Sequence, residues 1–170
     1  MVINHSEQLL RFLDELGKRL PEPAEIYLFG GSALLLIGGA RHTGDVDFTL
    51  NTPSLPLRQL IAALASELDL DFEESIPAEF MPLPTGFAQR HQLVGRFGFL
   101  TAYIFDLYSI AVMKIDRAFR TDLQDVQFLL GGGHIDLAFL EQCIADVASR
   151  YDEPRKLRRN FEELKRNLKH

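Results

Sequence analysis

The chain has 170 residues, of which 46% are hydrophobic and 25% are charged, and its net charge is −6 at pH 7. This length and apolar content suit a compact domain, or a core with a small helical appendage. We expect no membrane span and no signal peptide, because no apolar run is long enough and the N-terminus lacks a basic segment before an apolar core. The negative charge argues against nucleic-acid binding by the whole surface.

The chain contains a single cysteine, Cys143, and five histidines. One cysteine excludes an internal disulfide framework and fits a reducing cytoplasm, which is the location we expect. The apolar neighbours of Cys143 predict a buried structural thiol. The histidines show no spacing that is typical of metal ligands.

The first predicted element is a helix over Ser6–Leu20, because its apolar residues recur at helical spacing. Pro21 and Pro23 end this helix. A short apolar run over Ile26–Phe29 then predicts a strand. We expect these elements to form core and to carry no chemistry.

The stretch Glu25–Leu50 predicts a strand, a turn, a short helix, a second turn and a second strand. Gly30 and Gly31 have no side chains that would block close approach of a ligand. Ser32 would open the helix over Ala33–Ile37, and the N–H groups at a helix N-terminus favour an anion such as phosphate. We therefore predict that Gly30, Gly31 and Ser32 bind a nucleotide. The alternative is a simple turn.

The second strand of this stretch, Asp45–Leu50, alternates polar and apolar residues. Side chains alternate between the faces of a strand, so Asp45 and Asp47 share one face, and Val46 and Phe48 point to the core. Two carboxylates on one face repel each other unless a cation lies between them, and Mg2+ prefers such oxygen ligands. We predict that Asp45 and Asp47 are catalytic ligands of Mg2+, in a site with room for two metal ions. The alternative is a solvated strand face.

A Gly-Ser turn followed by an Asp-x-Asp strand resembles the signature of the DNA polymerase beta-like nucleotidyltransferase superfamily. The stretch is more closely similar to small bacterial nucleotidyltransferase-like proteins related to the AbiEii toxins, which include a family labelled as a domain of unknown function. The resemblance implies Mg2+-dependent transfer of a nucleoside monophosphate from an NTP to a hydroxyl of RNA or protein. It also implies a toxin or antitoxin partner in a toxin–antitoxin system. The alternative is a catalytically silent relative that acts by binding, for instance as an antitoxin.

The next segments are a predicted helix over Leu55–Leu68, a short strand within Asp69–Glu74 and an irregular, proline-rich stretch over Ser75–Gln92. The resemblance implies that the short strand pairs antiparallel near the edge of the sheet. Long irregular loops in compact domains are often functional. Arg90 resembles the arginine that follows such a proline-rich segment in the family, which implies that it holds a phosphate. A solvated loop arginine is the alternative.

The segment Leu93–Asp106 predicts a hairpin with a turn or bulge at Gly95 and Gly98, and its strand residues are apolar on both sides, as in a strand covered on both faces. Enzymes of the superfamily generally use a third carboxylate on a later strand, as a base or to complete the metal site. The resemblance therefore implies that Asp106 is the third catalytic acid. The alternative is a helix N-cap.

A helix over Leu107–Phe119 follows, and a capping-box pattern at Thr121 predicts the start of another helix. A helical lysine before an Asp-x-x-Asp pair again resembles the AbiEii-like proteins. The resemblance implies that Lys114 contacts a nucleotide phosphate, and that Asp122 or Asp125 orients it. The alternative is a salt bridge on the surface of a helix pair.

Gly131–Gly133 predicts a helix end, and two more helices are expected over Asp136–Tyr151, with Leu137 inward, and from Pro154 onward. Basic residues crowd the last helix between Arg155 and Lys169. They predict a solvated basic face or, alternatively, a surface for RNA or an acidic partner.

Together these elements predict an α/β fold, with a small mixed sheet flanked by helices in a nucleotidyltransferase-like domain over 1–130. The residues 131–170 are expected to form a C-terminal helical extension packed on it.

Overall fold

The computed structural model describes residues 6–39 and 43–169, which divide into two compact units. The first unit contains the described residues up to Ile76 together with Gln92–Phe105. The second unit contains Pro77–His91 and the described residues from Asp106 onward. This division differs from the boundary expected at residue 130, because two helices before that residue belong to the second unit.

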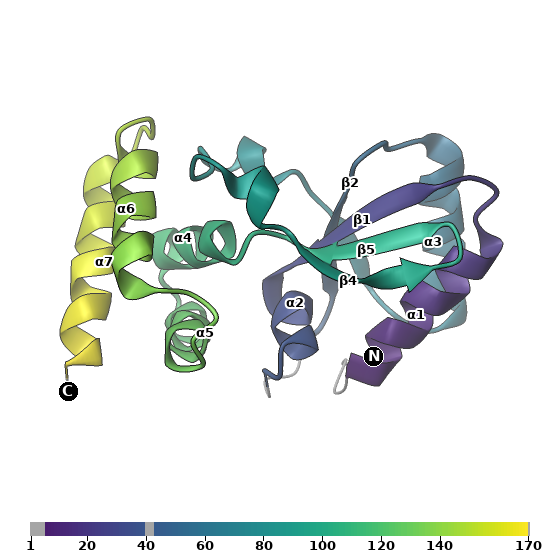
Figure 1. Cartoon of the computed structure of the whole chain (residues 1–170), viewed down its shortest axis with the longest axis horizontal. Helices are drawn as coiled ribbons and strands as arrows, with labels where there is room; N and C mark the ends of the chain where they lie inside the picture. Colours follow the sequence, from purple (N-terminus) through teal and green to yellow (C-terminus); the bar gives the residue numbers. More distant parts are fainter. Residues whose placement is uncertain (1–5, 40–42, 170) are drawn as a thin grey trace. The chain divides into compact units, whose positions relative to one another are not determined.

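The first unit is built on a five-stranded sheet in the order β3-β2-β1-β5-β4. The central strand β1 is antiparallel to β2 and parallel to β5, so the sheet is mixed and the predicted α/β class is confirmed (Figure 1). The strands are β1 (Ala24–Phe29), β2 (Val46–Leu50), β3 (Phe72–Glu74), β4 (Gln92–Phe97) and β5 (Leu100–Ile104).

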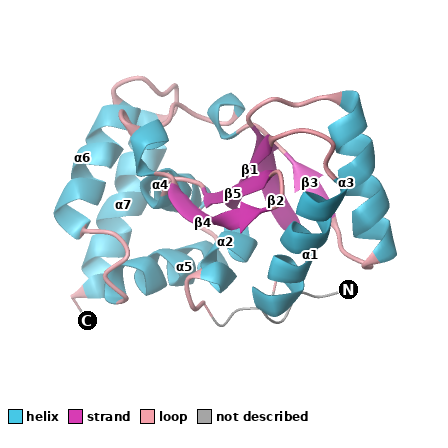
Figure 2. Cartoon of the chain, turned by 45° about the vertical axis from the view of Figure 1, so that its right-hand side comes forward, coloured by secondary structure: helices cyan, strands magenta, loops and turns pink. Residues whose placement is uncertain are grey.

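Three helices accompany this sheet: α1 (Ser6–Arg19), α2 (Gly30–Leu36) and α3 (Leu55–Glu67). α1 and α3 lie side by side next to the sheet (Figure 2). Their apolar side chains join the inward residues of β1, β2 and β5 in one hydrophobic core. Val46 and Phe48 are buried in this core, as their alternation predicted. Burial of these side chains fixes the opposite face of β2 outward.

The edge strand β3 pairs with β2 in a parallel arrangement, so the expectation of an antiparallel strand was wrong. The chain leaves β2, passes through α3 and returns in the same direction, and such a helical crossover joins parallel strands. The register places Val46 beside Phe72 and Asp47 beside Glu73.

β4 and β5 form the predicted hairpin, with a turn at Gly98 and a register shift between Leu93 and Gly95. Gly98 has a φ of 58°, and its Cα approaches the backbone of α1 at Gly17. Along β5 every second residue is buried and the intervening Thr101 and Tyr103 are half-buried. The expectation of a strand covered on both faces therefore holds for one face only.

The second unit contains four helices and two short 3-10 turns. α4 ends at Arg117 and not at the expected Phe119, because Ala118 adopts a left-handed conformation with a φ of 58°. α5 begins at Arg120 instead of Thr121, and the Asp122 side chain accepts the N–H of Phe119 at its start. Leu137 is 37% exposed, so its predicted inward position was wrong. The helices are α4 (Leu107–Arg117), α5 (Arg120–Gly131), α6 (Leu137–Ala148) and α7 (Pro154–Leu168).

Cys143 lies in α6 and is buried, as the sequence predicted. Burial raises the pKa of its thiol to about 11. The thiol therefore stays protonated near neutral pH, which suits a structural residue. Among the described residues, no helix is both long and apolar enough to cross a membrane.

Candidate functional site

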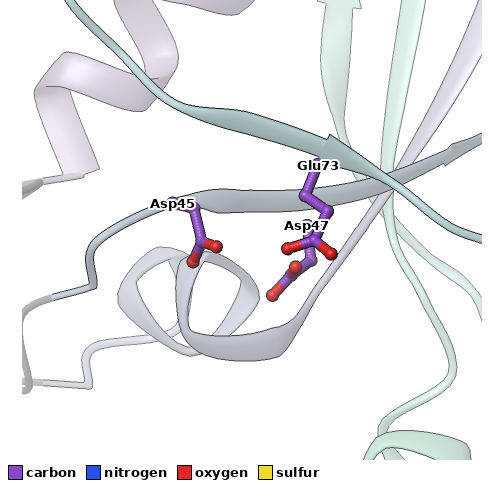
Figure 3. A group of neighbouring side chains, drawn as sticks. All are labelled: Asp45, Asp47 and Glu73. Carbon is purple, nitrogen blue, oxygen red and sulfur yellow. The ribbon is translucent and has the colours of Figure 1, made fainter.

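Three carboxylates converge on one side of β2 and β3 (Figure 3). Asp45, Asp47 and Glu73 each offer one oxygen atom, and these atoms all lie within 4.8 Å of one another. The structure thus brings Asp45 and Asp47 together, as their spacing predicted. It adds Glu73, which the sequence analysis missed.

The backbone around the aspartate pair is fixed on both sides. Val46 is fully buried and Phe48 is 4% exposed, so the residues that alternate with the aspartates are held in the core. The Thr43 hydroxyl donates a hydrogen bond of 2.9 Å to the carbonyl oxygen of Asp45. The direction of both aspartates therefore follows from the packing of β2 and not from contacts of their own side chains alone.

Glu73 reaches the cluster because β3 is parallel to β2 and in register with it. Asp47 and Glu73 are paired residues on the two strands. Phe72 contacts Phe12 and Phe48 in the core, so the next residue points to the opposite face. The alternation of Phe72 and Glu73 was visible in the sequence, but the pairing partner and direction of β3 were not.

Gly30 lies against the Asp47 carboxylate. Its φ is 67°, and a Cβ at this position would collide with Oδ2 of Asp47. The backbone conformation therefore favours glycine here, and an added Cβ would force the Asp47 carboxylate to move. The turn that the sequence identified is thus directly beside one member of the carboxylate cluster.

Ser32 is fully buried, and its hydroxyl donates a hydrogen bond of 3.0 Å to the carbonyl oxygen of Phe29. This bond ties the first turn of α2 to the end of β1. Helix α2 begins at Gly30, so Gly31 and Ser32 both lie in its first turn. In this structure the Ser32 side chain shapes the turn, and binding of phosphate by Gly31 and Ser32 stays a prediction.

The carboxylate cluster has the donor chemistry of a Mg2+ site. Among the described residues, no lysine or arginine pairs with Asp45 or Glu73. Two unit charges about 4.8 Å apart repel by roughly 1 kcal/mol in water, and by roughly 3 to 4 kcal/mol at an effective dielectric constant of 20. Mg2+ binds oxygen at about 2.0 to 2.1 Å, so opposite ligands lie about 4.2 Å apart. Oxygen atoms within 4.8 Å of one another are therefore close enough to become ligands of one Mg2+ ion after a small closure.

Asp106 belongs to the second unit, where it caps α4. Its oxygen atoms accept the N–H groups of Tyr108 and Ser109 and the hydroxyl of Ser109. Arg90 also binds it in a two-point ion pair of 2.9 and 3.0 Å, and Asp106 is fully buried. The N-cap alternative is therefore confirmed, while a catalytic role for Asp106 stays a prediction.

Arg90 is not a solvated loop arginine, because its side chain is 22% exposed and pairs with Asp106. It also donates to the carbonyl oxygen of Thr85, and its guanidinium lies over the rings of Tyr108 and Phe139. These contacts anchor the proline-rich segment within the second unit.

Lys114 lies in a buried ionic network between α4 and α5. Its Nζ atom is 2.8 Å from Asp125 and 3.6 Å from Asp122, and Lys114 is only 6% exposed. Arg117 binds Asp122 through two hydrogen bonds of 2.7 and 2.8 Å. The alternative of a salt bridge between the two helices is therefore confirmed, but its expected position at the surface was wrong, because the Lys114, Asp122 and Asp125 side chains are buried.

The pKa of Asp122 reflects two opposing causes. Burial raises it, but the hydrogen bonds and charge of Arg117, with the charge of Lys114, more than offset burial and hold the pKa below its ordinary value. Asp122 is therefore ionised at neutral pH. Binding of a nucleotide by Arg90, Lys114, Asp122 and Asp125 stays a prediction.

The sequence matches the model of a known protein family. The model of the family described as "nucleotidyltransferase of unknown function (DUF6036)" matches residues 7–169. The chain belongs to this family. No curated protein and no solved structure matched the chain. The match spans both units, and it confirms the sequence-based prediction at the level of a nucleotidyltransferase family.

Proposed function

We propose that this nucleotidyltransferase-family protein transfers a nucleoside monophosphate from an NTP to a hydroxyl group of RNA or protein. The observation that carries the proposal is the convergence of Asp45, Asp47 and Glu73 beside the turn at Gly30. Three carboxylates without a fixed counter-charge at Asp45 and Glu73 are costly to hold together unless a cation joins them.

Asp45, Asp47 and Glu73 would hold Mg2+, in a site that can take two ions. Mg2+ bound there supplies positive charge that offsets the triphosphate and stabilises the charge developing in transfer. In the reaction, the acceptor oxygen bonds to the α-phosphorus, the bond from that phosphorus to the bridging oxygen breaks, and pyrophosphate leaves. The acceptor proton passes to a carboxylate, and Glu73 is suited to this role because it is the exposed member of the cluster.

The structure supports a revised choice of third carboxylate. Asp106 was the sequence-based candidate, but its carboxylate oxygens are engaged in the cap of α4 and in the pair with Arg90. Glu73 has no such partner among the described residues and lies in the cluster. We therefore assign the third carboxylate to Glu73.

Two neighbouring glutamates on β3 provide a matched test. Glu73 faces the cluster, whereas the next residue, Glu74, points to the other face and binds Arg58 in a two-point ion pair of 2.7 and 2.9 Å. Glu73→Gln and Glu74→Gln remove the same charge from adjacent positions. The assay measures Mg2+-dependent incorporation of radioactive NTPs into total RNA and into protein acceptors, and Asp47→Asn is the inactive reference.

We expect Glu73→Gln to lower transfer by about 10- to 100-fold and to raise the Mg2+ concentration needed for half-maximal rate, because one ligand is lost. Glu74→Gln should keep transfer within about twofold, since it lies outside the cluster. Absence of labelling with all four NTPs, together with absence of NTP binding, would contradict the enzymatic proposal. Equal losses in the two glutamate variants would contradict the role of Glu73.

The order of the glycine turn and the Asp-x-Asp strand supports a relationship with the polymerase beta-like superfamily and the AbiEii-like proteins. We propose that the transfer acts within a toxin–antitoxin system. In that setting, Asp47→Asn would abolish growth arrest caused by expression of the protein. A silent, binding-only protein would keep its effect after the same substitution.

A further inference from the structure

The outer face of α7 is the most basic surface segment of this acidic chain. Residues 154–169 contain seven basic and two acidic residues, whereas the rest of the chain contains eleven basic and twenty-two acidic residues. The proposed reaction uses none of these basic residues.

The helix is amphipathic, and its inward side is fully occupied. Leu157, Phe161 and Leu164 are buried, and Asn160 donates to the carbonyl oxygens of Ile115 and Asp116 at the end of α4. α7 is therefore held firmly by its own unit, and its remaining faces are exposed.

Two of the seven basic side chains are neutralised by neighbours. Lys156 pairs with Glu153 and Asp116, and Lys165 pairs with Glu141 and Glu162. The other five have no acidic side chain within ion-pair distance among the described residues and are exposed: Arg155, Arg158, Arg159, Arg166 and Lys169. We call these five residues the basic stripe.

Helical geometry puts the basic stripe on one side of α7. At about 100° per residue, all five side chains fall within an arc of roughly 100°, and they extend over about 21 Å of helix. Glu162 falls within the same arc and pairs with Lys165, and Glu163 lies just outside it. The stripe therefore presents a row of unpaired cations, four of which are arginines.

We propose that the basic stripe of α7 binds the phosphate backbone of RNA. Arginine forks match phosphate geometry, and a row of them along a helix suits a linear polyanion. An acidic protein partner is less favoured, because protein interfaces centre on buried apolar and aromatic anchors, and the exposed face of the stripe contains none. The choice of RNA over other polyanions rests on the proposed function, in which RNA offers the acceptor hydroxyl.

The test measures binding by the full-length protein, without any transfer step. The probe is a fluorescein-labelled single-stranded RNA of about 20 nucleotides, titrated by fluorescence anisotropy between about 50 and 200 mM salt. The stripe variant is Arg155→Gln/Arg159→Gln/Arg166→Gln. The matched control is Arg11→Gln/Arg96→Gln/Arg120→Gln, which removes three exposed arginines elsewhere and gives the same net charge. Circular dichroism checks that both variants are folded.

We expect the stripe variant to bind RNA at least tenfold more weakly, and the control to stay within about twofold. Each phosphate contact contributes about 0.7 to the salt slope for a single strand, so the slope should fall by about 2 in the stripe variant. No RNA binding by the wild-type protein at low salt, or equal losses in the two variants, would overturn the proposal.

Two further probes test whether the basic stripe prefers RNA to other polyanions. Tighter binding of a DNA strand of the same sequence would overturn the assignment to RNA. Displacement of RNA by polyglutamate at equal charge would show an acidic protein surface to be the ligand.

Asp47→Asn should keep RNA binding, so loss of transfer in that variant with retained binding distinguishes the two proposals. Transfer to protein acceptors without RNA binding would defeat this inference alone.

Discussion

In the first unit, Asp45, Asp47 and Glu73 face one another, whereas in the second unit each buried aspartate of α4 and α5 has a lysine or arginine beside it. Both groups are carboxylates on helices and strands or next to their ends, and both are placed by packing of nearby apolar residues. They differ at Asp45 and Glu73, for which the described residues supply no lysine or arginine as counter-charge.

This difference separates two uses of the same chemical group. In the second unit, the cation is a lysine or arginine side chain, and its ion pair with the carboxylate links neighbouring segments of the unit. Asp106 shows this clearly, since its cap and its pair with Arg90 leave it fully buried. In the first unit, no lysine or arginine pairs with Asp45 or Glu73 among the described residues, so a cation from solution can act there. A group of carboxylates whose negative charge is not balanced by nearby lysines or arginines is the better guide to a functional site.

The sharpest test of this comparison applies one substitution in the first unit. Asp45→Asn should lower nucleotidyl transfer by more than about 1000-fold, equivalent to about 4 kcal/mol of transition-state stabilisation, because a metal ligand is lost. Without Mg2+, its free energy of unfolding should stay unchanged or rise by about 1 kcal/mol, since the substitution relieves repulsion within the cluster. Radiolabelled transfer and urea unfolding measure the two quantities. A loss of stability of several kcal/mol would mean that Asp45 is a structural residue.

The same chemical change in the second unit should act on stability. Asp125→Asn leaves Asp122, at 3.6 Å, as the remaining charged partner of the buried Lys114 among the described residues. We therefore expect the free energy of unfolding to fall by about 2 to 4 kcal/mol. Urea unfolding at pH 7 measures this value.

A double variant provides the control for the buried pair. Lys114→Met/Asp125→Leu removes both charges and should recover most of the lost stability, because an apolar pair of similar size carries no desolvation cost. If the single variant is as stable as the wild type, then the pair is not the buried structural link that its geometry indicates.

Local patterns were sufficient to predict the aspartate pair and its turn. Alternation over Asp45–Leu50 placed Asp45 and Asp47 on one face, and Gly30 and Gly31 were identified as a turn without side chains. Both inferences depend on residues near one another in the chain. The basic character of α7 and its buried apolar stripe were equally visible, for the same reason.

Features that depend on pairing between distant segments could not be predicted. Glu73 joins the cluster only because β3 is parallel to β2 in one register, and shifting that register by one residue would turn it to the core face. Asp106 and Arg90 form a pair 16 residues apart, which the sequence presented as two separate candidates. Burial of Lys114 likewise depends on how α5 packs against α4.

Two glycines with positive φ sharpen the comparison within the first unit. Gly30→Ala adds a methyl group against the Asp47 carboxylate, whereas Gly38→Ala, at a φ of 96°, meets nothing within 4 Å. Both variants incur the backbone cost of a left-handed residue, about 1 kcal/mol. We expect Gly30→Ala to lose about 1 to 2 kcal/mol more than Gly38→Ala and to need more Mg2+ for transfer. Thermal unfolding measures the stability difference, and Mg2+ titration of transfer measures the metal requirement. Equal effects of the two substitutions would mean that the turn at Gly30 does not influence the carboxylate cluster.

The smallest expected effect is the loss of stability of the second unit at acidic pH. The Asp122 carboxylate is 1% exposed, and its pKa is held below the ordinary value of 3.8 by Arg117 and Lys114 despite burial. A depressed pKa means that the unfolded chain binds the proton more tightly than the folded chain. The resulting stabilisation is fully present at neutral pH and is lost as the pH falls below 3.8 and through the folded pKa.

Asp122→Asn removes this titration and isolates its share of the acid dependence. The wild-type free energy of unfolding should fall with decreasing pH by up to about 1.4 kcal/mol per pH unit from this one group, within the window between its two pKa values. The variant should be less stable at pH 7 but should lose stability more slowly below pH 4, as measured by urea unfolding across that range. An unchanged slope would mean that Arg117 and Lys114 do not neutralise Asp122 in the folded protein. The distinction between carboxylates paired within the chain and carboxylates left for a metal ion would then fail at Asp122.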